Sequence, residues 1–171
     1  MNMLRKIVLI FLPACTLMSC GHRELDPQAY ISWMENPKNG LHASEIVGDF
    51  EFDLQYKPLS YVALKSMKKE KVNKEELLKS MQEMGDLQYY TLRINSANGK
   101  GEMLRTNLSA ADEYFYRVQY FSFQLKKDLY LLDGKDSLPC VFAHFERTYA
   151  ISPNNNFILA FPVSQEEKKE K

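Results

Sequence analysis

The segment Phe50-Glu51-Phe52-Asp53-Leu54-Gln55-Tyr56-Lys57 alternates apolar and polar side chains without a break. Because successive side chains of a strand point to opposite faces of a sheet, this pattern predicts a strand with one buried face. Gly48-Asp49 directly before it is a turn sequence. Residues 42–47 are therefore expected to form an earlier strand of a hairpin, or the two segments together form one bulged strand.

Helical patterns lie on both sides of this strand in the sequence. Asp26 and Pro27 suit the N-cap and first position of a helix that ends before Pro37. Pro58 opens a second helical stretch, and Asn73 can cap a third, which ends near Gly85. The first half of the chain thus supplies helices that can pack on the sheet.

The second half of the sequence is expected to be mainly strands. A second alternating segment covers residues 86–95 and is followed by a turn at 96–101, and Ser109 can cap a short helix from Ala110 to about Tyr116. Further strands are expected at residues 120–125, 129–132, 140–149 and 157–163. Because short turns join adjacent antiparallel strands, we expect an α+β fold, with an antiparallel sheet of about five to seven strands and two or three helices packed on one face.

Length and composition indicate one folded domain. The chain has 171 residues, of which 45% are hydrophobic and 12% aromatic. Lys plus Arg and Asp plus Glu number 22 each, so no basic face is expected and nucleic acid is excluded as an expected partner. We expect a single domain over residues 26–163 and a disordered charged tail over 164–171.

The amino-terminal segment has the features of an export signal. Two positive residues, Arg5 and Lys6, precede an apolar run from Ile7 to Met18, which is shorter than the roughly 20 residues a membrane span needs. Leu17-Met18-Ser19-Cys20 then resembles the lipobox of bacterial lipoproteins. An ordinary secretory signal or an amino-terminal core helix is the alternative.

The lipobox resemblance implies a processing route and a location. It implies cleavage between Ser19 and Cys20, removal of residues 1–19, acylation of Cys20, and a short linker over 20–25. Two or three acyl chains would hold the protein on a membrane essentially permanently. Gly21 replaces the Asp that retains many lipoproteins at the inner membrane, so the outer membrane is the expected location; which side of it the domain faces stays open.

Few residues suggest catalytic or metal chemistry. Cys140 is the only cysteine left after processing, and we expect it to be buried. His144 lies four residues further along the same predicted strand, roughly 13 Å away, which is too far for a catalytic hydrogen bond. The histidines are scattered, so no metal, cofactor or catalytic residue is expected. A carboxylate pair could still arise among Glu35, Glu51, Asp53, Asp112, Glu113 and Asp133.

Four residues are candidates for binding a ligand or partner: Trp33, Tyr56, Arg147 and Tyr149. Trp33 is the only tryptophan, although packing of its helix on the sheet would also explain it. The segments Gln55-Tyr56-Lys57-Pro58 and His144-Phe145-Glu146-Arg147-Thr148-Tyr149 resemble segments of small uncharacterised bacterial lipoproteins. For Arg147, a buried ion pair is the structural alternative.

These observations favour a non-enzymatic binding or accessory module of the cell envelope, with an envelope protein as its partner and the membrane reached through the lipid on Cys20. A small-ligand-binding lipoprotein with an aromatic-lined pocket is the second hypothesis, and a hydrolase with a carboxylate pair is the third. An exposed aromatic patch would favour the first hypothesis, whereas a closed pocket would favour the second.

Overall fold

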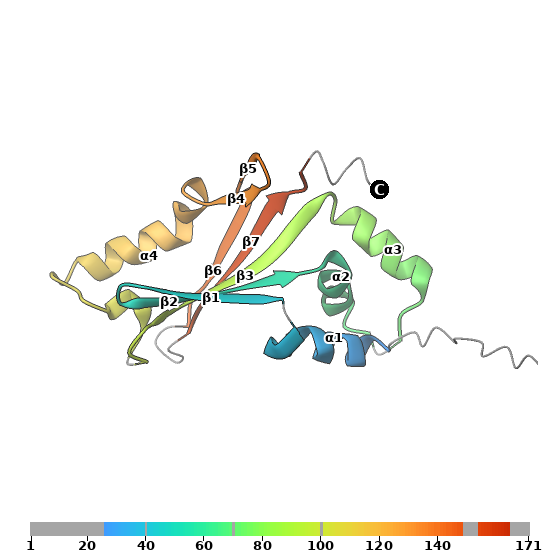
Figure 1. Cartoon of the computed structure of the whole chain (residues 1–171), viewed down its shortest axis with the longest axis horizontal. Coiled ribbons are helices and arrows are strands. Elements are labelled where there is room, and N and C mark those ends of the chain that lie inside the picture. The colour runs from blue at the N-terminus through green and yellow to red at the C-terminus, as the bar shows by residue number, and fades with distance from the viewer. Residues whose placement is uncertain (1–25, 40, 70, 100, 149–153, 165–171) are drawn as a thin grey trace, which may run out of the picture.

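The computed structural model describes residues 26–39, 41–69, 71–99, 101–148 and 154–164. It contains a five-stranded sheet in the order β1-β2-β3-β7-β6, all antiparallel, and a separate β4-β5 hairpin (Figure 1). The α+β fold and the antiparallel sheet are confirmed. The strands are β1 (His42–Val47), β2 (Phe50–Lys57), β3 (Leu87–Ser96), β4 (Tyr130–Asp133), β5 (Asp136–Pro139), β6 (Phe142–Glu146) and β7 (Asn155–Pro162). The α-helices are α1 (Pro27–Glu35), α2 (Leu59–Met67), α3 (Lys74–Glu83) and α4 (Glu113–Phe123), with short 3-10 helices at η1 (Pro37–Asn39), η2 (Met103–Arg105) and η3 (Leu125–Lys127).

The β1–β2 hairpin forms as one of the two alternatives predicted. Val47 pairs with Phe50 and His42 with Gln55, across a turn in which Gly48 has φ +59°. A side chain at this φ would be strained, which explains the glycine. The bulged single strand is therefore wrong.

Two of the three helix caps expected from the sequence, Asp26 and Asn73, are present, whereas Ser109 does not cap α4. The Asp26 carboxylate accepts hydrogen bonds from the backbone N–H groups of Gln28 and Ala29, at 2.9 and 3.0 Å. The Asn73 side chain accepts one from the Glu76 N–H at 2.8 Å. Each cap satisfies N–H groups that the first turn of a helix leaves without a partner, and this fixes where α1 and α3 begin.

One face of the sheet carries the main hydrophobic core. Phe157 of β7 is fully buried, with its ring 4.8 Å from that of Phe145 and 5.4 Å from that of Phe121 on α4. Helix α4, η2, η3 and the β4–β5 hairpin cover this face. The buried members of the core are Leu92, Ile94, Met103, Leu104, Leu125, Cys140, Phe145, Phe157, Leu159 and Phe161.

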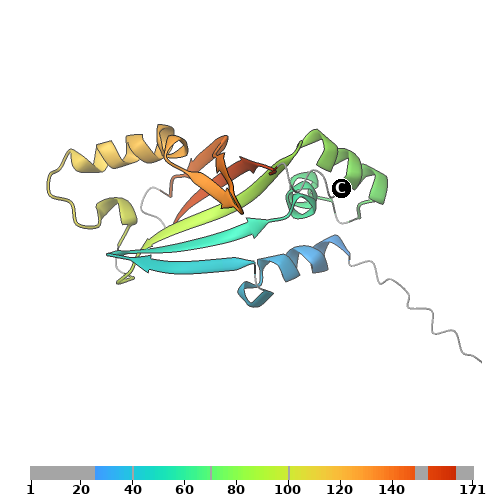
Figure 2. The same cartoon turned by 45° about the horizontal axis from the view of Figure 1, so that its top comes forward.

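The opposite face is covered at one end by α1 and α2. Gln55 points away from the main core, since it follows the core-facing Leu54, and its side-chain amide donates to the Met34 carbonyl oxygen at 2.9 Å. The buried residues Met34, Tyr61, Ala63 and Leu64 form a small second core there. The helices are thus divided between the two faces and not gathered on one, as the opposite positions of α4 and α1 show (Figures 1 and 2).

Residues 120–125 correct the sequence-based prediction, because they lie in α4 and η3 and not in a strand. The dense aromatics favoured a strand, but Tyr114, Val118 and Phe121 recur at helical spacing and pack together against the core. The helix expected from Ala110 begins instead at Glu113 and runs to Phe123.

The carboxyl-terminal strands also differ from a simple meander. Strand β5 was not predicted, and it pairs only with β4. Strand β7 inserts between β3 and β6, so the last of the described strands has a neighbour on each side in the sheet. Ser164, which was assigned to the tail, is buried, and residues 165–171 lie outside the described residues.

Candidate functional site

An open apolar groove lies between α4 and β2. Its volume is about 410 Å³, and it is lined by Phe50, Met103, Tyr116, Arg117, Tyr120 and Phe121. Phe50 belongs to the core face of β2, so the floor of the groove is part of the sheet. The groove therefore exposes apolar surface on a rigid support.

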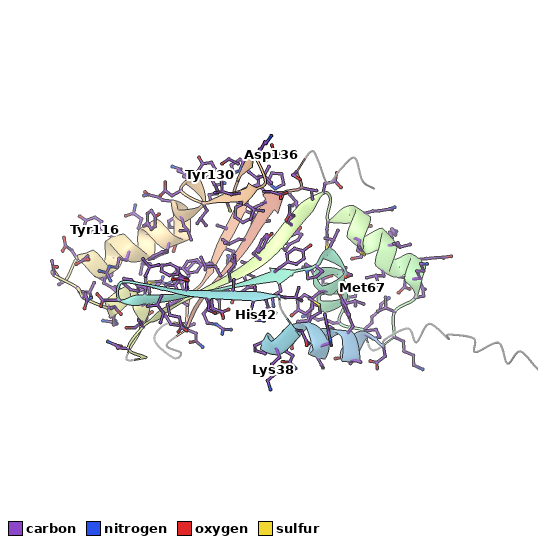
Figure 3. The ribbon with its side chains drawn as sticks, viewed as in Figure 1. Lys38, His42, Met67, Tyr116, Tyr130 and Asp136 are labelled. Atoms are coloured by element: carbon purple, nitrogen blue, oxygen red, sulfur yellow. The ribbon has the colours of Figure 1, made fainter. Side chains whose placement is uncertain are left out.

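Beside the groove, α4 presents large aromatic side chains to solvent. The exposed fractions are 71% for Phe115, 65% for Tyr116 and 76% for Phe123. We call these three residues the α4 aromatic surface. The β4 strand adds Tyr130, 59% exposed, and Leu132, 77% exposed, and Figure 3 shows Tyr116 and Tyr130 at the outer rim of the molecule. Exposed aromatic side chains of this kind favour the protein-binding hypothesis.

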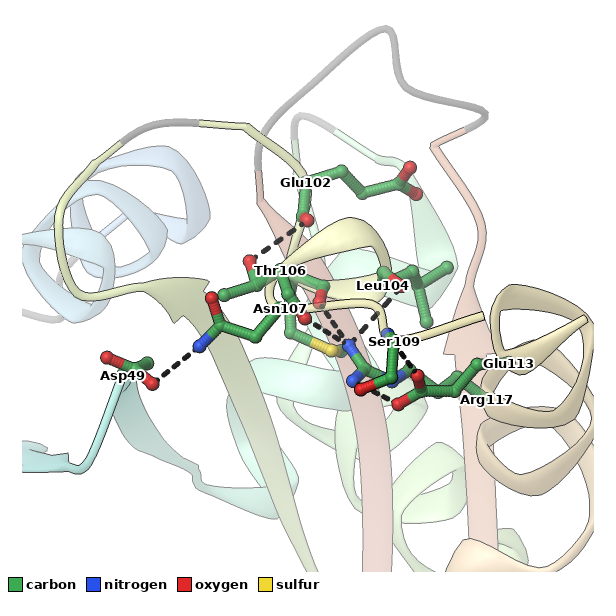
Figure 4. Close-up of polar contacts among 9 residues, drawn as sticks. Asp49, Glu102, Leu104, Thr106, Asn107, Ser109, Glu113 and Arg117 are labelled. Carbon is green, nitrogen blue, oxygen red and sulfur yellow. Dashed lines mark hydrogen bonds and ion pairs between the residues drawn. The ribbon is translucent and has the colours of Figure 1, made fainter. Parts of the chain in front are cut away.

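Arg117 holds the wall of the groove in place (Figure 4). Its guanidinium donates to the Thr106 carbonyl oxygen at 2.6 Å and to the Glu113 carboxylate at 2.6 Å. Two longer contacts of 3.5 Å reach the carbonyl oxygens of Met103 and Leu104. Because one side chain on α4 joins several backbone groups of the preceding segment, the two walls keep a fixed spacing.

Glu113 completes this polar contact at the start of α4. Its carboxylate accepts a hydrogen bond from the Ser109 backbone N–H at 2.8 Å. The hydrogen bond from that N–H lowers the pKa of Glu113 below its usual value, and the hydrogen bond from the Arg117 guanidinium is the second cause. The segment is also tied to the β1–β2 turn, because the Asn107 amide donates to the Asp49 carboxylate at 2.6 Å (Figure 4).

A second cavity, of about 340 Å³, lies between the sheet and the β4–β5 hairpin. It is lined by Tyr56, Gln88, Tyr90, Leu131, Leu132 and Asp133. The Tyr56 and Tyr90 ring centroids are 5.3 Å apart, and the Tyr90 hydroxyl donates to Gln88 Oε1 at 3.0 Å. The Gln88 Nε2 atom is buried without a hydrogen-bond partner in the described part of the chain. This cavity is more polar in character than the α4 groove.

The structure does not bring together the three sequence-predicted binding residues that it describes. Tyr56 lines the second cavity, whereas Trp33 is half exposed on α1, where its carbonyl oxygen accepts from the Asn39 amide. Arg147 follows β6 and is exposed, so it is not the buried side chain that the structural alternative required. Tyr149, Ser19 and Cys20 lie outside the described residues.

The groove residues were missed because their segment was assigned partly to a strand. Two signals in the sequence pointed to a helix with an exposed aromatic side. Glu113 and Arg117 have the i, i+4 spacing of a helical ion pair. Tyr116 and Phe123 are seven residues apart, which is two helical turns, so they lie on the same side of α4.

A cluster of ionisable groups joins α1 to α2. The Glu35 carboxylate accepts from the Tyr61 hydroxyl and from Lys65 Nζ, both at 2.9 Å, and Lys57 Nζ lies 4.8 Å from the Tyr61 ring centroid. Lys65 and Tyr61 lower the pKa of Glu35, while burial and then Glu35 raise the pKa of Tyr61. Burial lowers the pKa of Lys57. The cluster contains one carboxylate, so it is not the acid pair of a glycosidase.

Cys140 is buried, as predicted from the sequence. Its Sγ donates to the Phe142 carbonyl oxygen at 3.0 Å, and burial raises the pKa of the thiol. Burial therefore disfavours the thiolate, which is the form of cysteine that acts as a nucleophile. Among the residues described between 26 and 164, no three His, Cys, Asp or Glu side chains are grouped to hold a metal ion.

The helices described here, α1 to α4, include none with the length and apolar character needed to cross a membrane. Comparisons with protein-family models, curated proteins and solved structures found no match to the chain.

Proposed function

We propose that this protein is a lipid-anchored bacterial envelope protein that acts as a non-enzymatic binding module, and that α4 is its binding element. The observation that carries this proposal is the exposure of Phe115, Tyr116 and Phe123 beside an open apolar groove. Tyrosine and phenylalanine are enriched in protein interfaces, where their burial contributes much of the binding energy.

The rigidity of the site supports the same proposal. The Arg117 contacts fix the segment containing Thr106 against α4, so a partner would meet a groove that already has its bound shape. Preformed sites lose less conformational entropy on binding. The best-suited partner is a protein that inserts an apolar side chain between Phe50 and Tyr116.

The anchor is the second part of the proposal. Acylation of Cys20 would tether the domain through residues 21–25 to a membrane, which we propose is the outer membrane. Intact mass and membrane sedimentation of the native protein and a Cys20→Ser variant test this part. Acyl mass and sedimentation in the native protein alone would support it, and equal behaviour of both would refute it.

The binding site can be tested by photocrosslinking in intact cells. A photoreactive phenylalanine analogue replaces Tyr116 or Phe123, and the matched control carries it in place of Leu78, which is exposed on α3. We expect discrete crosslinked products from the two α4 positions and none from the control. No product from α4, or the same products from all three positions, would refute the proposal.

A second candidate function is binding of a small molecule in the cavity beside β4. The unpartnered Gln88 amide nitrogen favours it, because a ligand oxygen that entered with a small side-chain movement would satisfy that nitrogen. The test is a ligand screen by thermal shift on the native protein and a Gln88→Leu variant. A ligand that stabilises only the native protein would support this function, and the absence of any such ligand would count against it.

A further inference from the structure

We infer that the partner of the α4 aromatic surface is a second copy of this chain, bound with the two α4 helices antiparallel about a two-fold axis. This inference rests on the proposed function in taking α4 as the binding element. It goes beyond that function by naming the partner and the register of the contact.

The register follows from the spacing of the exposed residues on α4. Tyr116 and Phe123 are equally distant from the point midway between Gln119 and Tyr120. An antiparallel pair centred there places Tyr116 of each copy against Phe123 of the other. Each aromatic contact therefore occurs twice, as a two-fold interface requires.

The charges at the two ends of α4 fit the same register. Asp112 is exposed at the amino-terminal end, and Lys127 is exposed just beyond the carboxyl-terminal end. Counted in residues, they are also equally distant from the midpoint, so the antiparallel pair brings each Asp112 to the end of the other α4, beyond which Lys127 lies in η3. A parallel pair would bring like charges together at both ends, which disfavours it.

The surface is open to a second copy. The core-facing residues Tyr114, Val118 and Phe121 lie on the other side of α4 from Tyr116 and Phe123. In Figures 1 and 2, no described element covers the side of α4 that is turned away from the sheet. Two such helices can therefore approach without displacing any described element.

The charge pattern favours a protein over a membrane surface. Helices that lie on membranes carry mainly Lys and Arg on their polar face. Here Lys126 and Lys127 are exposed next to Asp128, and Asp112 is exposed at the other end of α4. The mixed signs at separate ends suit a complementary copy better than an anionic lipid layer.

The exposed area predicts a weak dimer. Large aromatic side chains carry about 150–250 Å² each, so the exposed fractions of 65% to 76% leave roughly 400 Å² of aromatic surface per copy. This is about half of the roughly 800 Å² per partner in a standard stable interface. Tethering both copies to one membrane through the proposed lipid would raise their effective concentration, as linking binding partners does.

Cysteine crosslinking in intact cells tests the register directly. Gln119→Cys places a thiol next to the two-fold axis, so mild oxidation is expected to give a disulfide-linked dimer. Ala111→Cys is the matched control, because Ala111 is exposed just before α4 and its two copies lie roughly 25 Å apart in the antiparallel pair at about 1.5 Å per residue. The unmodified protein, with its buried Cys140, gives the background.

The charge contacts are tested on the same background. Asp112→Lys in the Gln119→Cys protein is expected to lower the crosslinked fraction about fivefold, as expected for two exposed ion pairs replaced by repulsion. Adding Lys127→Asp should restore it. Circular dichroism of each variant checks that the fold is intact. We expect an intact fold, because both positions are exposed.

Each outcome separates this inference from the proposed function. Dimer from position 119 but not from position 111, with rescue by the charge swap, supports the inference. A dimer from both positions overturns the inference and leaves the proposed function standing. The absence of a dimer has the same meaning if photocrosslinking from Tyr116 captures another protein. Lack of any crosslink overturns both. Binding of anionic vesicles that is lost in Tyr116→Ser, without dimer, would identify the surface as a membrane contact instead.

Discussion

Replacing Arg117 by methionine tests whether one side chain holds the groove together. Methionine keeps much of the length and apolar stem of arginine but removes the guanidinium, and with it the hydrogen bond to the Thr106 carbonyl oxygen at 2.6 Å. A hydrogen bond from a charged donor contributes about 1.5–3 kcal/mol. The contacts at 3.5 Å add little, because they are at the limit of hydrogen-bond distance.

The Arg117 side chain is 22% exposed, so solvent weakens the contact and the low half of that range applies. We therefore expect Arg117→Met to lower the free energy of unfolding by about 2 kcal/mol. Urea unfolding followed by circular dichroism measures this change. Hydrogen exchange should accelerate in the segment around Thr106, because the loss of the anchor frees it.

Lys79→Met on α3 is the control, because it removes an exposed cation from a helix without any contact comparable to that of Arg117. We expect this control to change the free energy of unfolding by less than about 0.5 kcal/mol. If the two variants are equally stable and residues near Thr106 keep their protection, the proposed role of Arg117 is refuted.

Three further predictions concern the core, the α1–α2 contact and the free thiol. Phe157→Ala should lower the free energy of unfolding by about 3–5 kcal/mol, whereas Ile158→Ala, on the other face of β7, should cost clearly less in the same urea assay; equal losses would contradict the assigned core. Because the pKa of Glu35 is lowered in the folded protein, its contribution is present above the ordinary Glu pKa of 4.5 and is lost as the pH falls through the lowered value. In the native protein the urea midpoint of unfolding should therefore fall as the pH is lowered below 4.5, and in Glu35→Gln it should fall less steeply. An equally steep fall in both proteins would rule out this contribution. Cys140 should react with a thiol reagent at least about tenfold more slowly in the native protein than in urea, and equal rates would show that it is not protected.

Local features of the fold could be predicted from the sequence, because they depend on neighbouring residues. The alternation of residues 50–57 and the caps at Asp26 and Asn73 gave the correct β2, α1 and α3. The α4 segment was misjudged because aromatic residues favour strands in general, while their burial in this fold favours a helix that packs on Phe157. Packing of that kind depends on contacts that are distant in sequence.

The candidate site was harder to predict than the fold. Its groove combines Phe50 from β2, Met103 from η2 and Tyr116 from α4, and no spacing in the sequence shows that these three meet. The sequence correctly predicted a buried Cys140, since an isolated cysteine behaves as a small apolar residue. The lipobox is a local motif, and the predictions for Ser19 and Cys20 stay predictions.

The central position of β7 determines when the sheet can be completed during synthesis. Although β7 is the last strand of the described chain, it pairs with both β3 and β6. A nascent chain that ends before Asn155 lacks the strand that both of these neighbours require. The five-stranded sheet therefore forms only once the chain is available as far as β7, and contacts as distant in sequence as those between β3 and β7 slow folding.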